Sequence, residues 1–91
     1  MDARRQVGWN LRRLRVAKGM SQERLALEAG IDRAYVGRVE RGSENVTLDR
    51  IEALAKTLGV EVSELFREVE DGASLPKPLP AGRKGRESER R

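Results

Sequence analysis

The spacing of three residues between Gln22 and Arg41 restricts this chain to very few folds. Two helices that cross closely need a small residue where they touch, a glycine that can adopt positive φ in the turn, and a branched apolar residue that points back from the second helix. Ala26, Gly30 and Val36 supply these features in that order, at offsets of four and six residues. The pattern predicts a helix-turn-helix unit, and the alternative is an ordinary helical hairpin inside an all-α domain.

Apolar side chains recur at helical spacing on both sides of this unit. Val7, Leu11 and Leu14 fall on one face of a first helix, and further stripes run through residues 48–58 and 62–69. No segment alternates apolar and polar residues as a half-buried strand does. The expected helix caps are Ser21, Asp32, Thr47 and Ser63. The sequence therefore predicts a compact all-α domain of five helices.

The composition changes sharply after Asp71. Residues 72–91 contain all 3 prolines of the chain and a dense run of charged side chains, with few apolar residues that a core could bury. We expect one domain over residues 1–71 and a disordered tail over residues 72–91. The tail is interpreted as a solubilising segment, with sequence-independent attraction to phosphate as the alternative.

The lack of cysteine and histidine excludes several kinds of site. Disulfides, the usual zinc sites and His- or Cys-based catalytic pairs all need these residues. The chain also lacks a glycine-rich phosphate loop, so we expect no enzyme activity, no metal and no cofactor. No apolar run reaches the roughly 20 residues that span a bilayer, and the first residues lack the apolar stretch of a signal peptide, which predicts a cytoplasmic protein.

Positive charge is concentrated in the first half of the chain. Residues 1–41 contain ten cationic and five anionic side chains, whereas residues 42–68 contain three and six. This distribution predicts that one half faces an anionic partner and that the other faces water or a second subunit. A chain of 91 residues that is 37% hydrophobic builds only a marginal core, so a homodimer is expected.

Val36 and Val39 mark the buried side of the second helix of the unit at 100° per residue. The residues roughly opposite are Ala34, Gly37, Arg38 and Arg41, and Arg33 lies at the flank in the first turn. Such helices read DNA base edges mainly from their N-terminal part. Arginine can bond guanine O6 and N7 together, an alanine methyl can contact thymine, and a glycine lets the backbone approach the groove. The base-contact candidates are Arg33, Ala34, Gly37 and Arg38. The alternative for each arginine is a solvated helix face.

A helix N-terminus favours a phosphate, because its free amides and its dipole point at the ligand. Gln22 opens the first helix of the unit and is expected to hold the DNA backbone, unless it is only a helix-favouring surface residue. The Tyr35 hydroxyl is a weaker candidate, because its ring is equally well placed for partial burial. The expected phosphate contacts are Ser21, Gln22, Tyr35, Arg41, Ser43 and Asn45.

Two further predictions concern the scaffold and a second subunit. Arg15 and Glu40 lie on the flanks of apolar helix faces and are predicted to form a half-buried ion pair that locks the reading helix in place. The last apolar stripe extends beyond what a five-helix core needs, which predicts a dimer interface at Leu65, Phe66 and Val69. The alternative is that these residues close the core.

Residues 6–66 resemble the lambda-repressor-like, Cro/C1-type helix-turn-helix family, also called the XRE family. The landmarks of the resemblance are Arg15, Ser21-Gln22, Leu25-Ala26, Gly30, Glu40-Arg41-Gly42 and Leu58-Gly59. The stretch IDRAYVGRVERGSENVTL is similar to the controller proteins of restriction-modification systems, which are small homodimers that regulate their own operon. This chain departs from the family at Ala34 and Gly37, where Ser, Thr or Gln is common, so we expect readout to rest on two arginines and on DNA shape.

The resemblance implies a bacterial or phage-encoded, nucleoid-associated transcriptional regulator. It implies a homodimer on a near-palindromic operator, with the second helix of the unit in the major groove of double-stranded DNA. It also implies Gln22 on phosphate, Arg33, Ala34 and Arg38 on bases, and Arg15 with Glu40 as scaffold. The alternative function is an antitoxin or adaptor that uses the same fold mainly to hold a protein partner.

Overall fold

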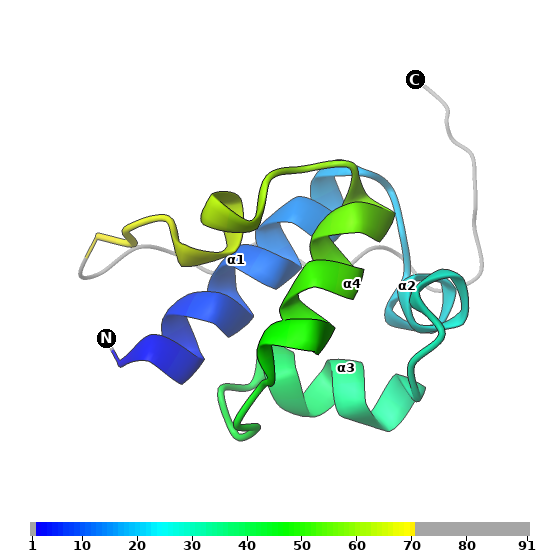
Figure 1. The fold of residues 1–91 in the computed structure, drawn as a ribbon, viewed down its shortest axis with the longest axis horizontal. Coiled ribbons are helices and arrows are strands. Elements are labelled where there is room, and N and C mark those ends of the chain that lie inside the picture. Colours follow the sequence, from blue (N-terminus) through cyan, green and yellow to red (C-terminus); the bar gives the residue numbers. More distant parts are fainter. Residues whose placement is uncertain (1, 71–91) are drawn as a thin grey trace.

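The computed structural model describes residues 2–70. Four α-helices are followed by a short 3-10 helix (Figure 1). Their bounds are Ala3–Ala17 (α1), Gln22–Ala29 (α2), Arg33–Glu40 (α3), Leu48–Leu58 (α4) and Val62–Phe66 (η1). The all-α prediction is confirmed, with the difference that the last element is a 3-10 helix of 5 residues. A segment this short forms too few i→i−4 hydrogen bonds to offset the free-energy cost of starting an α-helix. The predicted tail over residues 72–91 lies outside the described residues.

Three of the four expected cap residues, Ser21, Asp32 and Thr47, occupy N-cap positions, and two of these three make the capping hydrogen bond. The Ser21 hydroxyl accepts a hydrogen bond from the amide of Arg24 at 3.0 Å, and Thr47 caps α4 in the same way at 3.2 Å. Asp32 precedes α3 but makes no side-chain capping bond. Ser63 lies inside η1, whose N-cap position is Glu61.

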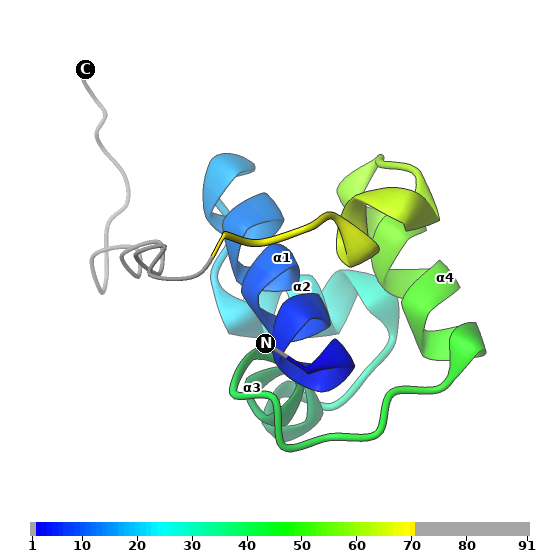
Figure 2. The same cartoon turned by 90° about the vertical axis from the view of Figure 1, so that its left-hand side faces the viewer.

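The helices surround a single apolar core. α1 packs against α3 and η1, and α2 packs against α3 and α4 (Figure 2). The buried apolar residues are Val7, Leu11, Leu14, Leu25, Ala26, Val36, Val39, Ile51, Leu54, Ala55, Leu58 and Leu65. They come from all five elements, and α3 packs against two of these, α1 and α2. No described helix is long and apolar enough to cross a membrane.

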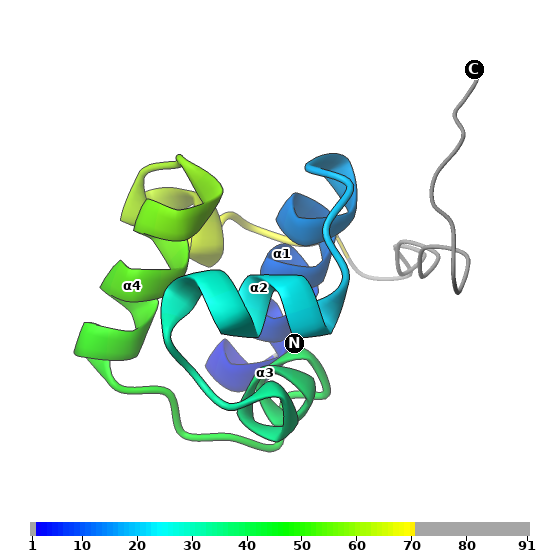
Figure 3. The same cartoon turned by 90° about the vertical axis from the view of Figure 1, so that its right-hand side faces the viewer.

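The predicted helix-turn-helix unit is formed by α2 and α3. Gly30 ends α2 with a φ of 70°, in the left-handed region that glycine adopts without strain. Ala26 and Val36 are both buried where the two helices meet. Figure 3 shows the steep crossing, because α3 is seen nearly end-on where α2 lies across the view.

A close contact between backbones sets the approach of α1 to the end of α3. A Cβ atom on Gly8 would lie 2.3 Å from the carbonyl oxygen of Val39 and 2.8 Å from that of Glu40. Only a residue without a side chain fits there. Gly8 therefore determines how near the last turn of α3 comes to α1.

Candidate nucleic-acid interface

The last residue of α3 is tied to α1 by a buried ion pair. Arg15 Nε lies 2.6 Å from Glu40 Oε2, and Arg15 Nη2 lies 3.0 Å from Glu40 Oε1. The side chains are only 4% and 3% exposed, so the pair is more deeply buried than the sequence suggested. Arg15 Nη1 also donates to the carbonyl oxygen of Met20 at 2.8 Å, which fixes the connection from α1 to α2.

Gln22, the expected phosphate anchor, extends this network. Its Nε2 donates to Glu40 Oε1 at 3.0 Å. Because an ionised carboxylate can only accept, this bond fixes which end of the Gln22 amide faces inward. The side chain is therefore held at the N-terminus of α2 by the same carboxylate that anchors α3. Ser21 beside it uses its hydroxyl to cap the helix.

The outer face of α3 presents three of the four base-contact candidates. Arg33, Ala34 and Arg38 are all exposed. Ala34 and Arg38 lie opposite the buried Val36 and Val39, whereas Arg33 lies on the flank of the first turn. Both arginines are thus available to an approaching partner. The first of them stands at the start of the helix, in the part that helices of this type direct to base edges.

Gly37, the fourth candidate, is buried rather than open to the groove. A Cβ atom on Gly37 would lie 3.2 Å from Arg41 Nη1 and 3.9 Å from Gln22 Oε1. These two side chains cover the glycine, so a guanidinium and not bare backbone occupies this part of the surface. Direct contact between the Gly37 backbone and a base would require Arg41 to move. The missing side chain makes room for Arg41.

Arg38 is held by two neighbours. Its Nε donates to Glu44 Oε1 at 2.8 Å, and the side chains are 44% and 25% exposed. The hydrogen bond to Glu44 raises the pKa of Arg38 above its ordinary value. The guanidinium also lies 5.7 Å from the centre of the Tyr35 ring, and that of Arg50 lies 5.4 Å from the same centre. Tyr35 is thus half-buried between cationic groups.

The other phosphate candidates follow α3. Ser43 donates both its amide and its hydroxyl to the carbonyl oxygen of Arg38, at 3.0 and 3.2 Å. It therefore closes the C-terminal end of the helix. Arg41 and Asn45 are exposed on the same loop side.

The three residues predicted at a dimer interface do not share one surface. Leu65 is 0% exposed and belongs to the core, which removes it from the predicted interface. Phe66 is 44% exposed and borders a hollow of about 180 Å³ that Leu48, itself 74% exposed, also lines. Val69 lies in a different hollow, beside Trp9.

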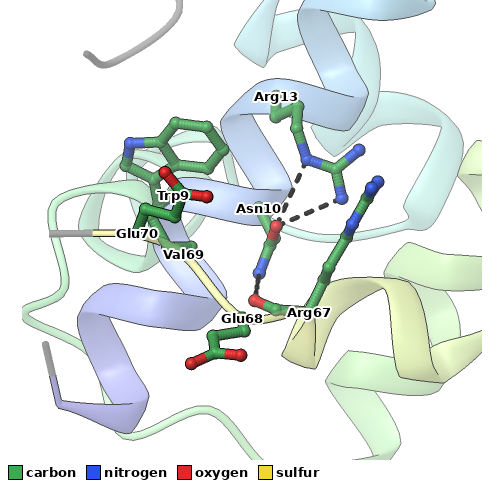
Figure 4. A pocket seen from close by; sticks show the side chains of 7 residues that line it. All are labelled: Trp9, Asn10, Arg13, Arg67, Glu68, Val69 and Glu70. Atoms are coloured by element: carbon green, nitrogen blue, oxygen red, sulfur yellow. Dashed lines mark hydrogen bonds between the residues drawn. The ribbon is translucent and has the colours of Figure 1, made fainter. Parts of the chain in front are cut away.

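That second hollow, of about 290 Å³, lies between α1 and residues 67–70 (Figure 4). Asn10 is one of the residues that line this hollow, and it is only 1% exposed. Its Nδ2 donates to the carbonyl oxygens of Leu65 and Arg67 at 3.2 and 2.7 Å, and its Oδ1 accepts from Arg13 Nη2 at 3.1 Å. Asn10 thereby ties the chain after η1 to α1.

Three residues that position α3, the chain after η1 or Arg38 were not singled out from the sequence. They are Gly8, Asn10 and Glu44. Asn10 gave a detectable signal, because it is a polar residue at the i+3 position of the stripe that contains Val7 and Leu11. Gly8 and Glu44 gave none, since their roles depend on residues more than five positions away.

The chain belongs to the helix-turn-helix family (HTH_3) of DNA-binding transcriptional regulators, whose profile matches residues 11–65. The family is one of regulators and not of enzymes. The predicted resemblance to Cro/C1-type proteins is thereby confirmed.

Three relatives place the chain more closely. It is 47% identical over 65 residues to a hypothetical transcription factor of Neisseria meningitidis serogroup B. The matched stretch covers 71% of this chain and only 61% of that protein. It is 54% identical to the restriction-modification controller protein C.AhdI from Aeromonas hydrophila, with a TM-score of 0.68 over 69% of this chain and 96% of that one. The controller protein C.Esp1396I, solved bound to a 19 base pair DNA duplex, is 33% identical, with a TM-score of 0.67 over 72% of this chain and 88% of that one.

Proposed function

We propose that this protein reads a near-palindromic DNA operator as a homodimer, with α3 of each subunit in the major groove. The observation that carries the proposal is the exposure of Arg33 and Arg38 on α3, a helix held on its scaffold by the buried Arg15–Glu40 pair. A rigidly mounted helix that exposes one guanidinium group at its start, on Arg33, and another in its last turn, on Arg38, suits guanine recognition. The duplex bound by C.Esp1396I supports this reading.

The surrounding residues divide into base readers and phosphate anchors. Arg33, Ala34 and Arg38 face the base edges. Gln22 and Arg41, whose side chains both lie beside Gly37, hold one strand of the DNA backbone. Such backbone contacts fix the register of the protein on the duplex without reading its sequence. Ser21, Tyr35, Ser43 and Asn45 lie around this surface as additional backbone contacts.

A second copy of the chain is the partner that fits the apolar surface at Leu48 and Phe66. These side chains are 74% and 44% exposed. Leu48 and Phe66 border one hollow, whereas Val69 belongs to another. Exposed apolar groups gathered at one place mark interaction sites in small proteins. We therefore place the dimer contact on this surface and retain Phe66 from the sequence-based prediction.

The similarity to controller proteins suggests the biological role. We infer that the protein regulates the operon of a restriction-modification system, as controller proteins are expected to do. An antitoxin or adaptor would instead need a protein partner, and in that case the chain alone would bind DNA weakly and without sequence preference.

Selection of binding sites from random duplexes tests the proposal. We expect enrichment of an inverted repeat whose half-sites are centred about 10 base pairs, or a multiple of that, apart, because two recognition helices of a dimer enter successive major grooves. Sedimentation of the protein with the selected duplex should give two chains per duplex. Recovery of no enriched sequence would contradict the proposal.

A further inference from the structure

We propose that Glu44 determines sequence specificity by positioning Arg38, so that the two terminal amino groups of its guanidinium face a guanine. The inference rests on the proposed function, because it assigns a role within the same DNA-reading surface. Glu44 itself makes no contact with the bases in this account. It acts through the arginine.

The geometry of the pair favours positioning over blocking. Glu44 engages Arg38 through Nε alone, at 2.8 Å. The groups that grip guanine O6 and N7 are donors at the end of the side chain, and this contact leaves Nη1 and Nη2 for them. A carboxylate bound to both terminal amino groups would have competed with the base instead.

The Tyr35 ring restricts Arg38 from a second direction. The guanidinium lies 5.7 Å from the ring centre. A long arginine side chain loses considerable rotational entropy when it is fixed on a base. An arginine already held by a carboxylate and a ring loses less on binding, so its contact with the correct base contributes more to discrimination.

The loop that carries Glu44 is attached to the residue it serves. Both the amide and the hydroxyl of the preceding residue, Ser43, donate to the carbonyl oxygen of Arg38. The Glu44 side chain is only 25% exposed. Its carboxylate is therefore placed relative to Arg38 by bonds to the backbone of Arg38 itself.

A carboxylate beside the DNA has two opposite effects, which makes the proposal testable. It repels phosphate and so weakens binding to every duplex. As a positioning group it strengthens binding to the correct sequence only. The substitution Glu44→Gln keeps the shape of the side chain, removes its charge and separates the two effects.

The experiment compares wild type and Glu44→Gln on the selected operator and on an unrelated duplex of equal length, at one salt concentration. We expect affinity for the unrelated duplex to rise by roughly twofold, because one negative charge is lost. We expect discrimination between the two duplexes to fall by about fivefold or more, the lower range for losing one bidentate base contact. The loss should map to a single base pair in each half-site and should vanish in the Arg38→Ala background.

Glu64→Gln is the matched control. Glu64 is also a partly exposed carboxylate paired with arginine, at 3.4 Å from Arg13 Nη2, but it belongs to η1, which lies away from α3 in Figures 1 and 2. This variant should keep the discrimination of the wild type. Thermal melting of both variants checks that the fold is intact.

Two results would overturn the inference. If Glu44→Gln raises the affinity for both duplexes equally, Glu44 only repels phosphate. If Arg38→Ala leaves discrimination unchanged, Arg38 is not a reader and Glu44 has nothing to position. A wild type that selects no sequence would instead overturn the proposed function, together with this inference, before either variant is compared.

Discussion

Glu40 connects α3, the proposed reading helix, to the rest of the scaffold. Its two carboxylate oxygens accept from Arg15, and one of them also accepts from Gln22. A single buried group thus joins the N-terminal helix, the start of α2 and the end of α3. The proposed phosphate anchor and the proposed reading helix are positioned by the same charge.

Removing Arg15 should therefore destabilise the fold strongly. The Arg15→Ala variant leaves a buried carboxylate without its cation, at an expected cost of about 3 to 5 kcal/mol in the free energy of unfolding. Urea denaturation followed by circular dichroism measures this change. Arg24→Ala, which breaks the exposed pair between Arg24 and Glu28 on α2, should cost about 0.5 kcal/mol or less. Equal effects of the two substitutions would contradict the account.

Substitution of Gly37 should change the thermal stability of the protein and its affinity for DNA in opposite directions. Gly37→Ala gains about 1 kcal/mol of helix propensity, so the melting temperature should rise. The new Cβ would lie 3.2 Å from Arg41 Nη1 and displace that guanidinium, so operator affinity should fall by about threefold, or roughly 0.7 kcal/mol. In the Arg41→Ala background the same substitution should leave affinity unchanged. A loss that persists there would mean that Gly37 itself meets the DNA.

At the scale of elements, the contact between α1 and α3 sets the geometry of the interface. Helices normally pack with side chains between them, but here the backbone of α1 at Gly8 lies against the carbonyl groups of Val39 and Glu40. The end of α3 is therefore fixed by close backbone contact as well as by the ion pair. Neither the angle nor the depth of α3 can change without disturbing α1.

Gly8→Ala should disrupt this contact. A Cβ atom 2.3 Å from a backbone oxygen forces α1 and α3 apart, and overpacking of this kind costs about 1 to 3 kcal/mol, which exceeds the gain in helix propensity. Differential scanning calorimetry should show a lower melting temperature. Ala17, at the exposed end of α1, provides the control. Ala17→Gly should cost about 1 kcal/mol or less, from helix propensity alone.

The sequence predicted the elements well because their signals are local. The stripe of Val7, Leu11 and Leu14 and the spacing of the helix-turn-helix unit depend on neighbours within one or two helical turns. The last stripe misled where helical periodicity stops, because residues 67–70 are not helical and Val69 no longer shares a face with Phe66. The pairing of Arg38 with Glu44 and the cover over Gly37 depend on how a loop and long side chains fold back, which periodicity does not encode.

At the scale of the whole molecule, the apolar surface of Leu48 and Phe66 belongs to elements other than the helix-turn-helix unit. In the proposed dimer, this contact sets the distance between the two copies of α3. The separation of the subunits and the spacing of the operator half-sites are then one geometric property. Changes at this surface should alter binding to a full operator and spare binding to a half-site.

Leu48→Glu tests this separation of roles. Leu48 is 74% exposed at the first position of α4. A carboxylate there interacts favourably with the helix dipole, so we expect the variant to fold. A charge in an apolar contact should weaken dimerisation by about tenfold or more in sedimentation equilibrium. Leu27→Glu, at a residue 77% exposed on α2, should leave dimerisation unchanged. A dimer unaffected by Leu48→Glu would place the contact elsewhere.

The most direct test of DNA reading by α3 is the affinity for a set of operators in which each base pair is replaced in turn. It should be measured for wild type, Arg33→Ala, Arg38→Ala and Gln22→Ala. The account predicts that each arginine variant loses about 1 to 3 kcal/mol of discrimination at its own position in the half-site, while Gln22→Ala weakens binding to all operators alike. If both arginine variants weaken binding to every operator equally, the arginines contact only the backbone, and the assignment of base readout to α3 is wrong.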